Sequence, residues 1–506
     1  MQKNSLEHTN NSITRIHRTN LPRGNSMKQH VTEWIEKARQ ELTELDTEAV
    51  KASGILPDRG RGFFPVVSYP PITMYSDMDE SDLFDNFEQR RQIPTIGYLH
   101  VPFCPSRCTY CHWITKTKSK DEEVSTYIDY IDREMVLYKN RLGVDQIPVS
   151  SVLWGGGTPT YPKPAQLERL FKSFTTHYDL SQCTQFSVEA EPTTLIGEDG
   201  IARLKIMKSY GVDRISLGVQ SVDDNVLPTM GRAHTHAQTL EAIENMRKAG
   251  FDNIYIDLIY GYPGQTIEKW AEDMLYAVTL DVDGYQLYRL RIKQLGDRKG
   301  NIINLLEKKP QMFHDADEVF LMKYLGKIIS EDNGFHEYQR RIFSKRDGIS
   351  SHYLRDWFLK LYDVAGVGVS AWSTLRGVFS INIGEKDLNK YYQYIDNGKV
   401  AINRGKILTF DDVARRSFML PLKNGYVDKA FYKSHVGKDA ANLFENEIAW
   451  MKQLDMIAED DGKFWLTRRG AFFADEVATQ FFNPQYVAYD DIRFAPGRKQ
   501  LVQETH

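Results

Sequence analysis

Residues 98–111 read Tyr-Leu-His-Val-Pro-Phe-Cys-Pro-Ser-Arg-Cys-Thr-Tyr-Cys and place Cys104, Cys108 and Cys111 within eight positions. The chain of 506 residues has only four cysteines, which disfavours a disulfide scaffold and favours a reducing compartment. Thiolates clustered in this way are typical of metal or redox chemistry. Three thiolates can bind three corners of a four-iron cluster, which leaves the fourth iron open to another ligand. The isolated Cys183 is expected to be a small buried residue.

A zinc site is the alternative for this cysteine motif. His112 follows Cys111 directly, so the motif could supply a Cys3His ligand set. Adjacent residues rarely chelate one tetrahedral ion without strain, and the spacing differs from that of paired zinc ligands. A glycine-rich stretch at residues 155–159 also has no explanation in a zinc site. The iron–sulfur interpretation is therefore favoured.

Short apolar runs alternate with longer segments of helical period between residues 95 and 288. This alternation predicts parallel strands joined by crossover helices. The expected strands are residues 95–100, 151–154, 185–189, 214–217, 253–258 and 284–288, and helices are expected at 122–138, 163–174 and 267–280. Six such units indicate an α/β fold, a partial (β/α)6 barrel that stays open.

Barrels of this class carry their chemistry at the carboxyl ends of the strands. Polar or glycine residues follow or end each of the six predicted strands. In strand order they are the three cysteines, residues 155–159, Glu189 with Glu191, Gln220, Asp257, and Tyr288 with Arg289. We therefore expect one rim of the barrel to be the functional site.

Further units are predicted on either side of the barrel. They are a polar, partly disordered lead-in and helix at 1–60, an N-terminal arm at 61–92, the core at 93–300, a mixed extension at 301–405, a winged-helix-like domain at 406–485 and a tail at 486–506.

The net charge is −4, and acidic residues 459–461 lie between the predicted strands of the winged-helix-like domain, so a nucleic-acid partner is not expected. No apolar run approaches the roughly 18 residues of a membrane span, and we expect a cytoplasmic protein without a membrane partner.

The motif at residues 98–111 resembles the cluster motif of the radical S-adenosylmethionine (SAM) superfamily, in the form found in its HemN-like branch. The resemblance covers roughly residues 68–482 and continues through 155–160, 214–221, 256–266, 366–368 and 404–412. It implies a radical SAM barrel with a C-terminal HemN-type domain and a [4Fe-4S] cluster on the three cysteines. It also implies reductive cleavage of SAM to a 5′-deoxyadenosyl radical, with an electron donor such as flavodoxin or ferredoxin.

The resemblance further implies which residues contact SAM. They are Tyr98, Gly156, Gly157, Thr158, Glu189, Gln220, Arg232 and Asp257. These residue types suit the ligand, because glycines let backbone groups approach it closely and Glu189 can accept hydrogen bonds from ribose hydroxyls. Arg232 can pair with a carboxylate as a fork.

Tyr288, Arg289 and His234 are the candidates for substrate chemistry. Alternation along an extended strand would place Arg289, Arg291 and Lys293 on one face. That face either binds the carboxylates of an anionic substrate or of a second SAM, or is a charged edge exposed to solvent. His234 either handles protons or is a polar surface residue.

Three functions remain open within the HemN-like branch, two of them reactions and one a binding role. Its coproporphyrinogen dehydrogenases carry an additional cysteine just after the third cluster cysteine, where this chain has His112 and Trp113. This departure favours a class C-like enzyme that binds two SAM molecules and transfers a methyl or methylene group to an sp2 carbon of an anionic or unsaturated small molecule. Oxidative decarboxylation of a tetrapyrrole is the second hypothesis, and a haem-binding chaperone is the third.

Overall fold

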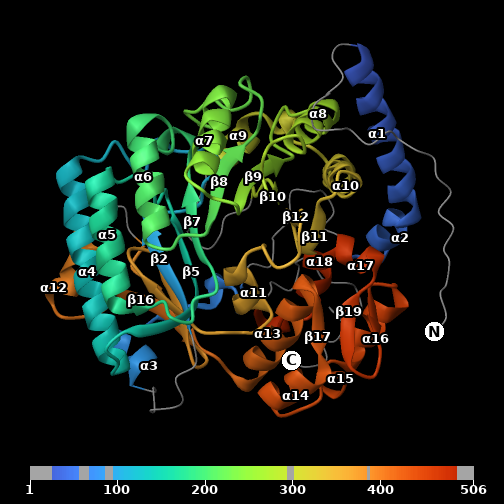
Figure 1. The fold of residues 1–506 in the computed structure, drawn as a ribbon. Coiled ribbons are helices and arrows are strands. Elements are labelled where there is room, and N and C mark those ends of the chain that lie inside the picture. The colour runs from blue at the N-terminus through green and yellow to red at the C-terminus, as the bar shows by residue number, and fades with distance from the viewer. Residues whose placement is uncertain (1–24, 56–67, 86–94, 293–300, 385–387, 487–506) are drawn as a thin grey trace, which may run out of the picture.

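The computed structural model describes residues 25–55, 68–85, 95–292, 301–384 and 388–486 (Figure 1). Six parallel strands form the centre of its large sheet, and each pairs with the next in chain order. They are β2 (Thr95–Val101), β5 (Ile147–Gly156), β7 (Phe186–Ala190), β8 (Arg214–Gln220), β9 (Ile254–Tyr260) and β10 (Gly284–Arg289). The predicted strands and their parallel order are confirmed. Asp257 lies within β9 rather than at its end, because the strand continues to Tyr260.

The sheet continues beyond both edges of this six-stranded unit. The strand β13 (Val364–Val367) pairs with β2 in parallel and leads into antiparallel β14 (Trp372–Leu375), β15 (Val378–Asn382), β16 (Ile402–Ile407) and β1 (Ser76–Asp77). On the other edge β10 pairs with β12 (Ile342–Ser344), which forms a hairpin with β11 (His336–Gln339). Among the described strands the path runs from β1 to β11 without closing, so the barrel is a partial one.

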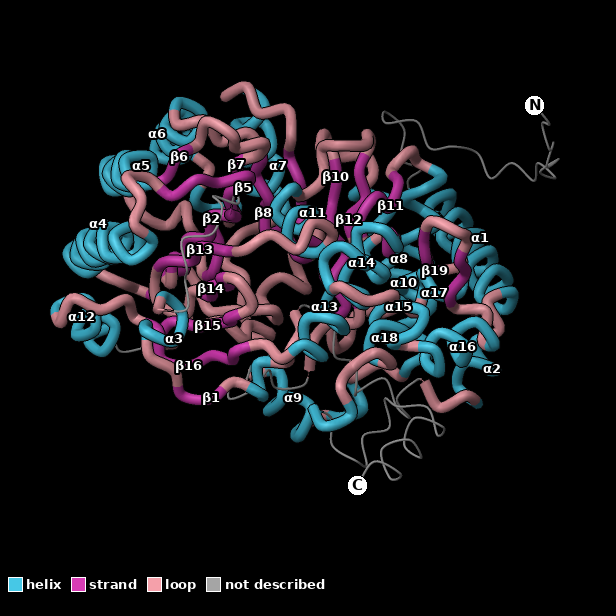
Figure 2. The backbone as a smooth tube through the Cα atoms, turned by 90° about the horizontal axis from the view of Figure 1, so that it is seen from below, coloured by secondary structure: helices cyan, strands magenta, loops and turns pink. Residues whose placement is uncertain are grey.

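Helices cover the outer face of the strands. The connecting helices are α4 (Asp121–Leu142), α5 (Pro164–His177), α6 (Gly197–Ser209), α7 (His236–Lys248) and α8 (Ile267–Ala277), followed by α9 (Ile302–Lys308) and α10 (Ala316–Asp332). The sequence of α4 explains its packing, because the six apolar residues spaced three and four apart between Val124 and Tyr138 are all buried. Gly143 follows the last residue of α4 and caps the helix with a φ of 67°, which suits a glycine. In Figures 1 and 2, α4, α5 and α6 lie on one side of the strands, opposite the C-terminal helices.

Shorter elements complete the part of the chain that precedes the C-terminal domain. They are α2 (Thr47–Ala52), α3 (Glu80–Phe84), α11 (His352–Phe358), α12 (Leu388–Asp396), β3 (Phe103–Cys104), β4 (Lys116–Thr117) and β6 (Tyr178–Asp179). The N-terminal helix α1 (Asn25–Glu44) packs along α8 and α10. The hydroxyl of Tyr324 on α10 donates to Glu41 of α1 at 2.8 Å, which anchors this contact.

The C-terminal part is a winged-helix-like domain. It contains α13 (Phe410–Asn424), α14 (Lys429–Val436), α15 (Ala440–Leu443), α16 (Glu445–Gln453), α17 (Arg468–Phe472), α18 (Ala474–Thr479) and an antiparallel sheet of β17 (Tyr426–Asp428), β19 (Lys463–Leu466) and β18 (Ile457–Glu459). The sequence did not predict β17 and α14, which are short. Aromatic contacts of Phe418 with Phe444, Phe464 and Phe481 form its core. None of the helices in the described ranges combines the length and apolar character needed to cross a membrane.

Candidate active site

The three cysteines lie in a loop at the carboxyl end of β2. Cys104 ends the short strand β3, and the loop after it is held by the segment between β8 and α7. The N–H of Thr109 donates to Met230 O at 3.0 Å, and Ser106 Oγ donates to Gly231 O at 2.9 Å. A Cβ atom at Gly231 would lie 2.6 Å from the carbonyl oxygen of Arg107, so this position requires a glycine. Two strand ends therefore fix the cysteine loop.

The three thiols of this loop are the predicted ligands of an iron–sulfur cluster. Among the described residues, no group of three His, Cys, Asp or Glu side chains converges on one metal position. A four-iron cluster binds each thiolate at a different corner and does not require such convergence. Burial raises the pKa of Cys104 to about 12 and that of Cys111 to about 11, and the other cysteines of the loop add to both shifts. Iron would stabilise the thiolate forms that burial alone disfavours.

The glycine-rich turn after β5 seats the cysteine loop. The N–H of Gly157 donates to Val101 O at 2.7 Å, and the Thr158 hydroxyl lies 3.5 Å from the Cys104 sulfur. A Cβ at Gly157 would meet the backbone of residues 101–103 at 2.8 Å, and a Cβ at Gly156 would meet the His100 ring at 2.6 Å. These glycines are therefore required by the close approach of two chain segments. Direct contact of Gly156, Gly157 and Thr158 with SAM stays a prediction.

Glu189 lies on the other side of the same turn. Its carboxylate accepts the N–H of Gly156, and a Cβ at Gly155 would lie 2.8 Å from its Oε2. Burial and then the charge of Asp257 raise the pKa of Glu189 to about 7. Asp257 accepts a hydrogen bond from Ser216 Oγ at 3.2 Å, and burial raises its pKa to about 6. The two carboxyl groups thus lie close enough for their charges to interact, and their contact with SAM stays a prediction.

Arg232 contacts a cluster cysteine directly. Its Nη1 donates to the Cys108 sulfur at 3.3 Å, and its Nη2 donates to Gly218 O at 2.5 Å and lies 3.4 Å from Glu191 Oε1. The side chain is only 9% exposed. Both terminal nitrogens therefore have partners within the chain, and Arg232 lies beside a predicted iron ligand. Its predicted pairing with a carboxylate of SAM stays a prediction.

His234 is buried and does not reach the barrel interior as a free base. Its Nδ1 lies 3.1 Å from Glu191 Oε1 and its Nε2 lies 3.1 Å from Val219 O, and its side chain is 0% exposed. The hydrogen bond from His234 lowers the pKa of Glu191 although burial alone would raise it. This placement argues against the predicted role in substrate proton transfer and also against a surface position. His234 positions Glu191, which in turn lies beside Arg232.

Gln220 and Tyr98 complete the predicted SAM contacts. Gln220 ends β8 with a φ of 71°, a backbone conformation that non-glycine residues rarely adopt. Such backbone strain is often found at functional sites. Tyr98 is buried in β2, and its hydroxyl lies 3.0 Å from His100 Nδ1. The rings of Tyr353 on α11 and Trp372 lie 6.4 and 6.0 Å from its ring. No sequence pattern pointed to Tyr353, because α11 is brought to the barrel only by the fold.

Tyr288 and Arg289 point to opposite faces of β10. Burial and the carboxylates Asp257 and Glu189 raise the pKa of Tyr288 well above its usual range, so its hydroxyl belongs to the barrel interior. Arg289 instead lies over the ring of Phe320 on α10, with 5.9 Å between the guanidinium carbon and the ring centre. Adjacent residues of a strand alternate between faces. Arg289 therefore faces α10, and the catalytic roles of Tyr288 and Arg289 stay predictions. The strand β10 ends at Arg289, and Lys293 lies outside the described residues.

Comparison with known proteins agrees with this geometry. Residues 98–277 match the family model of the radical SAM superfamily, and residues 408–473 match that of the HemN C-terminal domain. The chain therefore contains a radical SAM domain and a HemN C-terminal domain, and its relatives are HemN-like proteins. The matched superfamily implies a [4Fe-4S] cluster and SAM as cofactors.

Relatives of this radical SAM protein span most of its length. It is 28% identical to the heme chaperone HemW of Bacillus subtilis (strain 168), over 76% of this chain and 98% of the relative. It is 27% identical to the oxygen-independent coproporphyrinogen III oxidase of Escherichia coli (strain K12), over 82% of this chain and 91% of the relative. The solved structure of coproporphyrinogen III oxidase from Escherichia coli superposes with a TM-score of 0.69 at 24% identity and covers 82% of this chain and 96% of that one. This last likeness concerns the fold.

Proposed function

We propose that this radical SAM protein abstracts a hydrogen atom from a carboxylate-bearing organic substrate, in an oxidation related to that of the oxygen-independent coproporphyrinogen III oxidases. The observation that carries the proposal is the turn at residues 155–158. One side of this turn contacts the Cys104 sulfur through Thr158, and the other side holds the Glu189 carboxylate. An iron ligand and an acceptor suited to ribose hydroxyls are thereby adjacent.

When bound, the cluster supplies the electron that cleaves SAM to the 5′-deoxyadenosyl radical. The residues of this chain would bind and orient SAM and the substrate, and they would exclude water from the site. Glu189 would accept from the ribose, and Arg232 keeps a positive charge against Cys108. The Tyr98, Tyr353 and Trp372 rings line a wall that keeps water from a reactive radical.

Tyr288 would donate a hydrogen bond to the substrate. A tyrosine phenol is protonated near neutral pH, and burial and then the neighbouring carboxylates raise the pKa of Tyr288 still further. A protonated phenol beside Asp257 and Glu189 is a donor that can fix an anionic or unsaturated group. We further propose a small electron-transfer protein such as flavodoxin or ferredoxin as reductant, in a reducing compartment such as the cytoplasm.

Methyl or methylene transfer with a second SAM is the second candidate. His112 and Trp113 follow Cys111 where the coproporphyrinogen dehydrogenases carry a further cysteine, and this departure favours a different reaction. The relatives named above give methyl transfer no support. A haem chaperone, as in the name of the Bacillus subtilis relative, is the non-enzymatic candidate.

One experiment separates these candidates. The anaerobically reconstituted and reduced protein is incubated with SAM carrying a deuterated methyl group and with coproporphyrinogen III as the candidate tetrapyrrole. The proposal predicts unlabelled 5′-deoxyadenosine together with substrate-dependent release of carbon dioxide. Deuterium in 5′-deoxyadenosine would favour methyl transfer instead. Stable haem binding without SAM cleavage would favour the chaperone.

A further inference from the structure

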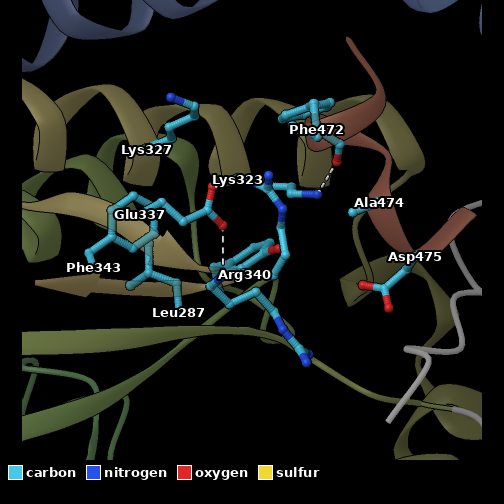
Figure 3. Close-up of a pocket in the computed structure, with 12 residues that line it drawn as sticks. Leu287, Lys323, Lys327, Glu337, Arg340, Phe343, Phe472, Ala474 and Asp475 are labelled. Atoms are coloured by element: carbon cyan, nitrogen blue, oxygen red, sulfur yellow. Dashed lines mark hydrogen bonds and ion pairs between the residues drawn. The ribbon is translucent and has the colours of Figure 1, made fainter. Parts of the chain in front are cut away.

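A second pocket lies outside the barrel interior, at the junction of β10, α10, the β11–β12 hairpin and the C-terminal domain (Figure 3). It is partly open to solvent. Of its lining residues, Lys323, Lys327, Arg340 and Arg341 are cationic, and Glu337 and Asp475 are acidic. The lining therefore has two more cationic than acidic side chains, although Lys327 pairs with Glu331 outside it, and this excess suits an anion.

The acidic residues of this pocket already have cationic partners. Glu337 forms an ion pair with Arg340 at 2.8 Å, which Figure 3 shows, and Asp475 pairs at 2.5 Å with Lys423. Each of these carboxylates thus contacts a cation other than Lys323 and Arg341, although Asp475 also acts on both of them at longer range. Neither Lys323 nor Arg341 forms an ion pair with a carboxylate within the part of the chain that the structure describes.

Lys323 and Arg341 keep donor capacity for a ligand. The ammonium group of Lys323 donates to Phe472 O and lies 4.6 Å from the centre of the Phe472 ring, which accounts for one of its three N–H groups. The Nε of Arg341 is buried without a hydrogen-bond partner among the described residues. An unpartnered guanidinium N–H beside a partly used ammonium group is an arrangement that an oxyanion would satisfy.

The backbone of Arg341 gives a second, independent argument. Gln339 pairs with Ile342, so Arg340 and Arg341 form the two-residue turn of the β11–β12 hairpin. Arg341 has a φ of 71°, whereas such turns favour glycine or asparagine. Its N–H donates to Glu337 Oε1 at 2.7 Å, and its carbonyl accepts from the N–H of Leu287 at 2.9 Å. The fold thus holds an arginine in a conformation that costs free energy, which points to a role for its side chain.

We propose that this pocket binds a small organic carboxylate, with Arg341 as the principal ligand and Lys323 as the second. A guanidinium matches the two oxygens of a carboxylate as a fork, and an ammonium group adds a point charge. The guanidinium carbon of Arg341 also lies 5.9 Å from the centre of the Tyr288 ring, whose hydroxyl belongs to the barrel interior. The ligand would therefore bind next to a residue of the candidate active site. This proposal does not depend on the reaction proposed above.

The test measures binding of succinate and inorganic phosphate to the full-length protein by calorimetry, with sodium chloride at matched ionic strength. Succinate is expected to bind one site per chain and more tightly than phosphate. Arg341→Asn should weaken succinate binding by at least about tenfold, since charge-assisted hydrogen bonds are lost. Asparagine tolerates a positive φ, so this variant should unfold at the same temperature as the wild type or higher. The matched control is Arg346→Gln, which removes an exposed charge beyond β12 and should leave binding unchanged.

Several outcomes would overturn the proposal. They are no succinate binding by the wild type, equal binding by Arg341→Asn, equal weakening by Arg346→Gln, or tighter binding of phosphate than of succinate. If Arg341→Asn does not fold, Arg341→Lys keeps the charge and removes the fork. Weaker succinate binding by that variant supports the site, and unchanged binding contradicts it. Because the readout is binding rather than turnover, its failure is distinguishable from failure of the proposed reaction.

Discussion

The Arg232 guanidinium donates to the sulfur of Cys108 at 3.3 Å, although the two residues are 124 positions apart in the chain. A buried positive charge beside an iron ligand favours the more negative, reduced state of a cluster. Arg232→Gln is therefore expected to lower the reduction potential by on the order of 60 mV, about 1.4 kcal/mol for one electron. A redox titration followed by electron paramagnetic resonance measures this shift. Arg232→Lys should retain most of the potential, and an unchanged potential in Arg232→Gln would contradict the assigned role.

The Gly157 position tests the contact between the glycine-rich turn and the cysteine loop. A Cβ there would lie 2.8 Å from three backbone atoms of residues 101–103, which cannot move like the end of a flexible side chain. Gly157→Ala is expected to lower the free energy of unfolding by about 1–3 kcal/mol and to reduce the iron content. Gly462→Ala is the control, because its Cβ would meet only Asp460 Oδ1, at 3.6 Å. Chemical denaturation and iron analysis check both variants, and wild-type values for Gly157→Ala would rule out the tight contact.

The raised pKa of Glu189 predicts a pH-dependent cost of folding. Its pKa of about 7 in the folded protein lies above the ordinary 4.5, so the folded state binds more protons than the unfolded state between these values. The free energy contributed by this group is favourable at low pH and is lost as pH rises through about 7. Glu189→Gln should therefore stabilise the protein relative to the wild type by up to about 3 kcal/mol at pH 8 and much less at pH 5. Denaturation of the two proteins at both pH values tests this, and a gain that does not grow with pH would be inconsistent with it.

His234 is expected to act through position rather than by proton transfer. Both of its ring nitrogens lie at hydrogen-bond distance from protein acceptors, so His234→Ala leaves the buried Glu191 carboxylate with one partner fewer. We expect a loss of about 1–3 kcal/mol in the free energy of unfolding. His234→Asn should recover part of it by donating to Glu191. A proton-transfer role would instead appear as a changed pH dependence of turnover with unchanged stability.

The sequence predicted the strands of the barrel and the cysteine loop well, because both follow from local patterns. Apolar runs alternate with helical segments, and polar residues such as Glu189 and Asp257 follow or end those runs. Contacts between distant segments were not predictable in this way. The contact of Arg232 with Cys108, and the approach of Tyr353 to Tyr98, arise only when the strands are brought together.

The two faces of β10 show a second reason why the structure differs from the sequence-based predictions. The sequence placed Tyr288 and Arg289 together at a strand end, but alternation along the strand sends one inward and the other toward α10. The pattern was present in the sequence, although it could not reveal which face of the strand would be covered by α10. Arg341 gave no signal, because its strained turn depends on the pairing of β11 with β12.

The most direct test of the account is SAM cleavage by the reduced protein and by its cysteine variants. The wild type and Cys183→Ala, whose native thiol lies apart from the loop and donates to Gln185 O, should contain iron and form 5′-deoxyadenosine from SAM under anaerobic conditions. Cys104→Ala, Cys108→Ala and Cys111→Ala should each lose the cluster and the product. Full iron content in all three variants, or no 5′-deoxyadenosine from a wild type with a complete cluster and the substrate candidates present, would contradict the account.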